Sequence, residues 1–519
     1  MKKKTIAGIM VTLTLLAALV YVIPIQAQRP TIKIGIIGPN ELPHWSPVGM
    51  KEGAEMARDE INVAGVNVEG DQVYDFELVF ADEHSAPPHD AAAAQQEIVD
   101  LVGAGCKAIM GGFRTEVTLP MLEKAMDLDT PFLINGAATS WLLANVTTNY
   151  ARYKYAFRVN PINDSMLIPS VCAYLRDYLI PERLLPMCGH DLGMGYDQVK
   201  YAVLTEDLDW TLAIHAALTT PPTSVYLLGP YANLSYQARV PYTTSDFTDP
   251  YFNTIKANNI HLVLHIFSGA EGTTFTIDFV DDAVPAIAVG INVMAQLQTH
   301  WGATGGKAEI EAILNSVGTR TVIIPGVSDV FWDNFTANYS GGGWPIYTAI
   351  GAYGGLYALK EAIEYSDAFD ASSIVTGLEE IPPRMTPTGM SSFTSAHDLL
   401  CTSTGAYQGD DTNVRALMVQ WQASGTYGEQ RVVSPVDKPY SRRFKIPTDL
   451  YEFADTDLNF DGKVNILDAI RLAGAFGTQP GDTNWNLEAD VKINGKINIL
   501  DAIALAGDFG GKAAVWPIP

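Results

Sequence analysis

Strand-like and helix-like segments alternate over most of this chain, and the alternation limits the fold more than any other feature of the sequence. Short apolar runs indicate strands, and the segments between them repeat apolar residues at helical spacing. The expected strands are 31–38, 75–82, 106–112, 131–136, 201–206, 260–267 and 285–292, and the expected helices are 48–61, 91–102, 117–126 and 347–365. Such alternation builds parallel sheets covered by helices. The 519 residues are enough for two α/β lobes and a smaller domain.

Two similar twelve-residue segments near the C-terminus begin at Asp457 and Asp490. Each has oxygen-bearing side chains at positions 1, 5, 9 and 12, a glycine at position 6, and an apolar helical pattern after it. Calcium takes several oxygen ligands at once, and the glycine allows the loop to turn sharply around the ion. The repeat therefore predicts a small all-α module with paired calcium loops over 451–511, joined by a linker over 441–450.

The two loops are not equivalent. The first offers as ligands Asp457, Asn459, Asp461, the carbonyl of Lys463, and Asp468, and the second offers Asp490, Asn494, the carbonyl of Lys496, and Asp501. The second loop has Lys492 at position 3, where an oxygen ligand is usual, so we expect weaker calcium binding there. The alternative for this loop is a decayed repeat that still folds as two helices.

The net charge limits which partners are expected, and the N-terminal segment indicates where the protein is located. The formal net charge is −25, whereas nucleic acids and anionic membranes attract positive patches, so neither is an expected partner. A basic start, an apolar run over 6–25 and a short polar exit predict an exported protein, extracellular or associated with the cell surface. Because the run is about as long as a membrane span, 1–28 is either a cleaved signal peptide or an N-terminal anchor.

Reactive motifs are scarce. The four cysteines, Cys106, Cys172, Cys188 and Cys401, allow three disulfide connectivities, and the sequence does not select one. No CxxC or Cys/His cluster predicts zinc. The sequence has neither HExxH nor GxSxG, and no nucleophile is paired with a base. A binding protein is therefore expected rather than an enzyme.

Several segments resemble, in order and spacing, the exported binding proteins of branched-chain amino-acid (Leu/Ile/Val-type) ABC transporters. They are IKIGIIGP (32–39), GMKEGAEMARDEIN (49–62), KAIMGG (107–112), NGAATS (135–140) and FRVNP (157–161). The similarity spans roughly 31–440 and implies the type I periplasmic-binding fold, with three crossovers near 157–161, 323–326 and 382. Lobe I would hold about 31–158 and 327–383, and lobe II about 159–326 and 384–440.

Two loops at strand ends run directly into helices, at 111–115 and 135–139. Backbone N–H groups at a helix start bind carboxylates, and small residues allow close approach. The resemblance implies ligand contacts in the same loops, from Arg114, Thr115, Ala137, Ala138 and Thr139. The two threonines could equally be ordinary helix N-caps. Arg114 could pair with an anionic ligand or point to solvent.

The resemblance implies further ligand contacts from Trp45 in a lid segment, from Trp210, and from the loop Ser268–Glu271. Asn292 falls where the amino-acid binders carry an acid for the ligand's ammonium group. An amide pairs weakly with an ammonium. Either Glu271 compensates, or the ligand is not an α-amino acid.

The C-terminal pair resembles dockerin type I repeats, in which loop positions 10 and 11 help to recognise a cohesin partner. Both copies have Ile-Leu there, at Ile466, Leu467, Ile499 and Leu500. Identical recognition pairs in a two-fold repeat would allow two docking orientations.

Together these features predict an exported two-lobe solute-binding protein. Closure of the lobes would capture a small carboxylate-bearing ligand, an amino acid or a relative, for an ABC permease. Calcium-dependent docking to a cohesin would retain the protein at the cell surface. The alternative is a surface assembly, adhesion or sensing subunit that uses the same lobes without transport.

Overall fold

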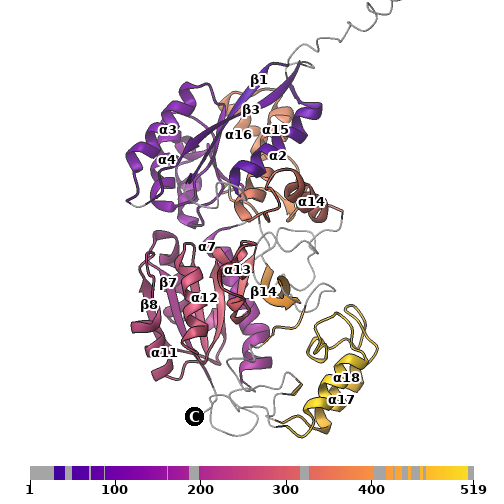
Figure 1. Ribbon diagram of the computed structural model, residues 1–519. Coiled ribbons are helices and arrows are strands. Elements are labelled where there is room, and N and C mark those ends of the chain that lie inside the picture. The colour runs from indigo at the N-terminus through magenta and orange to yellow at the C-terminus, as the bar shows by residue number, and fades with distance from the viewer. Residues whose placement is uncertain are drawn as a thin grey trace, which may run out of the picture.

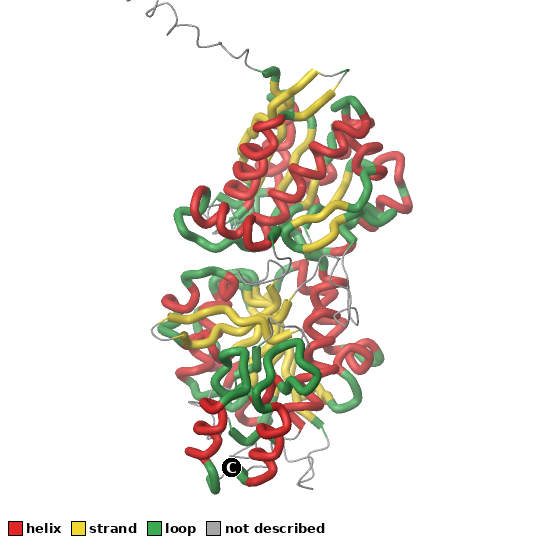
Figure 2. Tube along the Cα trace, turned by 90° about the vertical axis from the view of Figure 1, so that its right-hand side faces the viewer, coloured by secondary structure: helices red, strands yellow, loops and turns green. Residues whose placement is uncertain are grey.

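The chain folds into two α/β lobes and a small helical module (Figure 1). This computed structural model describes residues 29–40, 49–68, 70, 72–86, 88–160, 162–185, 198–315, 326–400, 417–424, 427–434, 442–445, 456–459 and 463–511. The lobes lie one above the other, and the yellow module lies beside the lower lobe. Seen from its outer side in Figure 2, the module places its loops over the strands of that lobe. The expected α/β class with parallel sheets is confirmed.

Lobe I contains a six-stranded sheet in the order β2-β3-β1-β4-β5-β6. All neighbours pair in parallel except β2 and β3, which are antiparallel. The strands are β1 (Thr31–Gly38), β2 (Val66–Val68), β3 (Gln72–Asp82), β4 (Ala108–Gly111), β5 (Phe132–Ile134) and β6 (Ala156–Arg158). Strands β4 and β5 and the edge strand β6 are buried along their whole length. They are apolar at nearly every position because helices cover both faces.

The helices of lobe I come from two distant parts of the chain. In Figure 1, α3 and α4 lie on one face of the sheet, and α2, α15 and α16 lie on the other. The helical segments are α2 (Met50–Ala64), α3 (Ala91–Gly103), α4 (Thr115–Asp127), η1 (Ser140–Leu143), α5 (Ala144–Thr148), α6 (Tyr150–Tyr153), α14 (Ser328–Asn338), α15 (Tyr347–Ser366) and α16 (Ala371–Glu380). Helices α14 to α16 therefore return to this lobe from a later part of the chain.

Lobe II contains a seven-stranded sheet in the order β15-β14-β11-β10-β9-β7-β8. Strands β7 to β11 pair in parallel, and β14 and β15 add an antiparallel edge. The strands are β7 (Val199–Glu206), β8 (Ala232–Val240), β9 (Leu262–Phe267), β10 (Ile287–Asn292), β11 (Glu311–Asn315), β14 (Leu417–Ser424) and β15 (Tyr427–Ser434). The sequence patterns predict β7, β9 and β10 but not the remaining four strands.

The helical segments of lobe II are shorter. They are α7 (Asp164–Tyr174), which continues into the π-helix η2 (Leu175–Leu184), η4 (Asp209–Thr211), α9 (Leu212–Thr219), α10 (Thr223–Leu228), η5 (Thr248–Phe252), α11 (Asn253–Ala257), α12 (Glu271–Asp281), η6 (Met294–Gln296), α13 (His300–Ala303) and η7 (Lys307–Ile310). A second buried cluster, rich in phenylalanine, fills the space between α11, α12 and the sheet.

The structure corrects the boundary predicted near residue 382. The hairpin of β12 (Arg384–Thr386) and β13 (Gly389–Ser391) follows α16. The hairpin and the residues after it remain on lobe I, because Arg384 donates to the carbonyl of Gly354 and the ring of His397 stacks on Phe157 at 4.0 Å. Lobe II resumes at β14, so the chain returns to it between residues 400 and 417. The predicted crossover at 323–325 and the lid residue Trp45 lie outside the described residues.

The predicted linker also differs from the expectation. Residues 442–445 pack along β14, and Phe444 is fully buried. The side chains of Gln420 and Gln422 donate to the carbonyls of Lys445 and Arg443, at 2.6 and 2.8 Å. A linker would leave these groups to water. Here they are bonded to a buried strand, so this stretch is part of lobe II.

The module consists of α17 (Ile466–Ala475), η8 (Leu487–Ala489) and α18 (Ile499–Asp508). A small core that includes Leu458, Leu472, Ile497 and Leu505 joins the helices. Two cysteines fall in the described part of the chain, and both Cys106 and Cys172 are buried thiols without a disulfide. Among the same residues, no helix is long and apolar enough to cross a membrane. The predicted N-terminal segment 1–28 lies outside them.

Candidate ligand-binding site between the lobes and calcium-loop module

A mostly apolar cavity lies where the carboxyl ends of the two sheets face each other. The space between its walls, part of which is open to solvent, measures about 560 Å³. Its walls come from both lobes and are formed by Phe113, Arg114, Gly136, Ala138, Ile162, Leu167, Trp210, Ser268, Ile291, Val293, Gln296, Leu314 and Tyr347. This is where open α/β sheets bind ligands. Of the ten sequence-predicted contacts, four line the cavity: Arg114, Ala138, Trp210 and Ser268.

Arg114 is the charged residue of the cavity wall. It is only 3 % exposed, and its Nε and Nη1 have no hydrogen-bond partner. No ion pair to its guanidinium occurs within the described part of the chain. Arg114 is also the N-cap of α4, where the helix dipole adds positive potential. Its guanidinium lies over the ring of Tyr242 in lobe II, 4.8 Å from the ring centroid. The resulting site attracts an anion.

The two strand-end loops meet, and their threonines bond to each other. The hydroxyl groups of Thr115 and Thr139 are 2.5 Å apart and fully buried. The carbonyl of Thr139 accepts a bond from Arg158 at 2.5 Å. Neither threonine caps its helix with its side chain. Thr115, Ala137 and Thr139 therefore stand behind the cavity wall and hold the loops together.

On the lobe II side, a buried carboxylate fixes two wall residues. Glu206, at the end of β7, accepts bonds from the indole of Trp210 and from the backbone and hydroxyl of Ser268, the latter at 2.9 and 2.6 Å. Glu271 lies behind Ser268 and accepts a bond from the backbone N–H of Gly269. Burial raises the pKa of Glu271 well above its usual range, and the adjacent Glu206 carboxylate raises it further.

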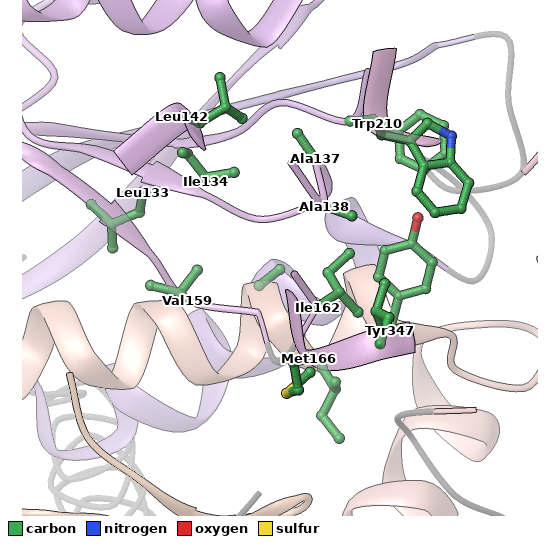
Figure 3. Close-up of a cluster of buried hydrophobic side chains, with 14 of the residues drawn as sticks. Leu133, Ile134, Ala137, Ala138, Leu142, Val159, Ile162, Met166, Trp210 and Tyr347 are labelled. Carbon is green, nitrogen blue, oxygen red and sulfur yellow. The ribbon is translucent and has the colours of Figure 1, made fainter. Parts of the chain in front are cut away.

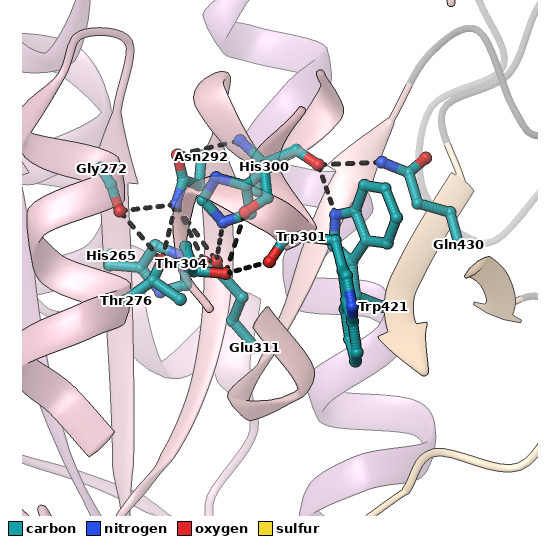
Figure 4. Close-up of polar contacts among 11 residues, drawn as sticks. His265, Gly272, Thr276, Asn292, His300, Trp301, Thr304, Glu311, Trp421 and Gln430 are labelled. Atoms are coloured by element: carbon teal, nitrogen blue, oxygen red, sulfur yellow. Dashed lines mark hydrogen bonds and ion pairs between the residues drawn. The ribbon is translucent and has the colours of Figure 1, made fainter. Parts of the chain in front are cut away.

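Asn292 is engaged inside lobe II rather than in the cavity (Figure 4). Its amide donates to the carbonyl of Gly272 at 3.0 Å and to Glu311 at 3.1 Å. Glu311 also contacts His265 at 2.8 Å and His300 at 3.3 Å. Burial alone would raise the pKa of Glu311, but the two histidines hold it well below its usual range. Asn292 is fully buried, and its amide supports the core of the lobe.

Contacts across the interface hold the lobes against each other. The backbone N–H of Asp209 donates to Glu116 of α4 at 3.0 Å. The ring of Trp344, before α15, stacks on Trp421 of β14 with centroids 5.6 Å apart. Figure 3 shows the hydroxyl of Tyr347 pointing toward Trp210, with Ala138 beside them. These contacts describe a closed arrangement in which residues of both lobes line the cavity.

Sequence reasoning missed Phe113, Tyr347 and Gln296. Phe113 lies within the predicted loop 111–115, so a prediction that every residue of this loop lines the cavity would have included it. Tyr347 opens the predicted helix 347–365, but nothing local shows that this helix start faces the loops of 111–139. Gln296 belongs to a short 3-10 turn after β10, a position that only strand order could have indicated.

In the module, each loop brings buried carboxylates to its centre. Asp457, Asp468, Asp490 and Asp501 are at most 1 % exposed. Asp468 and Asp501, at loop position 12, accept bonds from backbone N–H groups earlier in their own loops, at 2.7 and 2.9 Å. Gly495, at position 6, has φ +77°, a conformation that favours glycine.

These residues fit calcium. Paired buried carboxylates need a cation, and burial raises the pKa of Asp490. Asn459, Lys463, Asn494 and Lys496 lie in the described part of the loops, whereas Asp461 lies outside it. Within the described residues, no group of three or more His, Cys, Asp or Glu side chains is placed to hold a metal. In the loop that begins at Asp490, asparagine and backbone oxygens would complete the set.

The duplicated Ile-Leu pairs form a matched, solvent-facing surface. Ile466 and Ile499 are each 61 % exposed, and Leu467 and Leu500 are 51 % and 52 % exposed. An apolar groove between α17 and α18 ends at Phe476 and Phe509. The two copies are therefore exposed to nearly the same extent, and their role in docking stays a prediction.

The face of the module that carries Glu488 packs against lobe II. Glu488 pairs with Arg183 of η2 and, at 2.9 Å, with Nε of Arg443. The hydroxyl of Tyr178 donates to the same carboxylate. Burial would raise the pKa of Glu488, but the two arginines lower it to about 2. We call Glu488, Arg183, Arg443 and Tyr178 the Glu488 cluster.

Two lobes that close on a cavity at the carboxyl ends of their sheets define a solute-binding protein. The chain belongs to the periplasmic binding protein family, whose model matches residues 31–402. Residues 455–508 match the dockerin type I domain, a domain that binds calcium. The family is one of solute-binding proteins rather than enzymes. No curated protein sequence is significantly similar to the chain.

Solved structures share the two-lobe fold at low identity. LivJ from Streptococcus pneumoniae, a branched-chain amino acid transporter substrate-binding protein in complex with isoleucine, is 18 % identical over 78 % of this chain and 100 % of its own, with TM-score 0.59. A putative branched-chain amino acid ABC transporter protein from Silicibacter pomeroyi is 17 % identical over 81 % and 100 %, with TM-score 0.61. A solute-binding protein from R. palustris in complex with benzoate is 14 % identical over 77 % and 95 %, with TM-score 0.56.

Proposed function

We propose that this chain is an exported solute-binding protein that captures a small carboxylate-bearing molecule between its lobes for an ABC permease. The supporting observation is Arg114, a buried guanidinium with unpartnered N–H groups in an otherwise apolar wall. A buried charge without a counter-ion is costly. A ligand carboxylate would supply both the counter-ion and the missing acceptors. The ligands of two structural neighbours, isoleucine and benzoate, both carry a carboxylate.

Closure of the lobes would complete this site. Arg114 and Tyr347 come from lobe I, whereas Trp210 and Ser268 come from lobe II. A ligand that touches all four stabilises the closed form over the open one by its contacts to the second lobe. The permease would then receive the closed, loaded form.

The module would hold the protein at the cell surface. Calcium in both loops would neutralise the buried aspartates and fix α17 and α18, and the exposed Ile-Leu surface would bind a cohesin. The loop that begins at Asp490 would bind calcium more weakly, because Lys492 puts a cation where a ligand oxygen is usual.

Calorimetric titration of the full chain with small carboxylates, each paired with its neutral primary amide, tests the cavity. We expect measurable heats only for the carboxylates. Arg114→Gln should weaken binding by about 1.5 to 3 kcal/mol, the range for hydrogen bonds to charged groups. Arg176→Gln is the matched control, because this surface arginine pairs with its neighbour Asp177. Equal binding of acids and amides, or an unchanged affinity in Arg114→Gln, would show that the site is not a carboxylate site.

A further inference from the structure

The cavity wall has a cation but no anion. Arg114 is accompanied by three neutral polar residues, Ser268, Gln296 and Tyr347, and every other lining residue is apolar or glycine. A zwitterionic ligand brings an ammonium group as well as a carboxylate. Within the described wall, nothing offers that ammonium a carboxylate partner. A desolvated ammonium without an anion is strongly unfavourable.

Four acids lie near the wall, and none of them lines the cavity. Glu271 is 1 % exposed behind Ser268 and accepts a bond from the backbone N–H of Gly269. Glu206 is fully buried behind Trp210 and Ser268 and accepts bonds from both. Glu83 accepts a bond from the backbone N–H of Phe113 at 2.7 Å. Glu311 is held by two histidines and Asn292. None of these acids lines the cavity, so none reaches a ligand without breaking its present contacts.

One wall residue is a free neutral acceptor. Gln296 is 6 % exposed, its Nε2 donates to the carbonyl of Leu314 at 3.2 Å, and its Oε1 has no partner. The amide atom that bonds to the carbonyl oxygen of Leu314 has to be a donor, so it is the nitrogen Nε2. The atom without a partner is therefore the oxygen Oε1. A neutral hydroxyl donates to such an oxygen at little desolvation cost, whereas an ammonium keeps an uncompensated charge.

We propose that the ligand is an aryl or branched alkyl carboxylate without an ammonium group, and that Gln296 accepts a hydrogen bond from a hydroxyl on its apolar body. This inference rests on the proposed carboxylate-binding function and narrows it. The carboxylate lies against Arg114 and the start of α4. The body lies among Trp210, Tyr347 and the aliphatic side chains of the wall.

Matched pairs that differ only in the α-ammonium group test the proposal. The pairs are phenylpropanoate with phenylalanine, para-hydroxyphenylpropanoate with tyrosine, and methylpentanoate with leucine. In calorimetry on the full chain we expect the member without ammonium to bind at least about 100-fold more tightly, because the other buries an unpaired cation. Equal affinity, or tighter binding of the amino acids, would overturn the inference and leave the carboxylate function standing. If no member of either series binds, the carboxylate function itself fails.

Two variants of Gln296 sharpen the assignment. Gln296→Glu places a carboxylate in the wall and should shift the preference toward phenylalanine by about 10-fold or more. Gln296→Met has a similar size and no acceptor. It should remove the advantage of para-hydroxyphenylpropanoate over phenylpropanoate while phenylpropanoate still binds. An unshifted preference in Gln296→Glu, with phenylpropanoate binding retained as the sign of a folded cavity, would contradict the role of this residue.

Discussion

Arg114 and Arg183 are both buried, but they differ in what surrounds the charge. Arg183 and its neighbour Arg443 share the carboxylate of Glu488, and Tyr178 donates to the same group. Arg114 has two N–H groups without an acceptor and no ion pair within the described residues. The chain itself supplies the counter-ion for Arg183, whereas the described residues supply none for Arg114. The difference separates a charge that holds domains together from a charge that binds a ligand.

The largest expected contrast is in stability. Glu488→Ala leaves Arg183 and Arg443 buried without a counter-ion, so it should destabilise lobe II and the module by about 3 to 5 kcal/mol. Arg114→Ala removes an already uncompensated charge and should leave the free energy of unfolding of the ligand-free chain unchanged or raised. Urea unfolding of the two variants measures both. A larger loss in Arg114→Ala than in Glu488→Ala would break the comparison.

A rise in pH should increase the contribution of Glu488 to the free energy of unfolding and decrease that of Glu83, which lies near Arg114. The arginines lower the pKa of Glu488 from 4.5 to about 2, so its stabilisation of about 3 kcal/mol is complete above pH 4.5 and is lost as the pH falls toward 2. Burial raises the pKa of Glu83, which lies beside Arg114, from 4.5 to about 7. Folded Glu83 keeps its proton while the unfolded chain loses it. Stability from this group therefore falls as the pH rises from 4.5 to 7.

The free energy of unfolding, measured against pH for Glu488→Gln and Glu83→Gln, separates the two contributions. The first variant should flatten the pH dependence below pH 4.5, and the second should flatten it between 4.5 and 7. Parallel curves for both variants and the parent chain would show that neither group carries the effect.

The smallest expected effect on the ligand site comes from calcium. Chelation should lower the helical signal of the module and abolish cohesin docking, because α17 and α18 each begin within a loop. Ligand affinity at Arg114 should change by less than about 2-fold, since no loop residue lines the cavity. Circular dichroism, pull-down with a cohesin and calorimetry provide the three measurements. Asp457→Asn should reduce calcium affinity, and helicity that is independent of calcium would reject the metal assignment.

The sequence predicts those elements of the fold that depend on residues close together in the chain. The apolar run of β1 and the helical spacing of apolar residues in α3 identified elements within a few residues of their bounds, and the small residues at 111–112 and 136–138 marked the strand ends at the wall. Pairings between distant residues left no such signal. Glu488 lies 305 residues from Arg183, and nothing near either residue indicates the other. The linker predicted at 441–450 rests on local features, a cluster of basic residues with prolines nearby, whereas the burial of Phe444 depends on contacts with distant residues.

The Glu488 cluster has a mechanical consequence. It mounts the module on lobe II, while lobe I touches the module through none of the described ion pairs. A cohesin-bearing scaffold that bound the module would therefore also hold lobe II, and lobe I would be the lobe that moves during the proposed capture and release. Lobe II and the module would stay fixed to the scaffold, and the cavity would open by movement of lobe I on the side away from the scaffold.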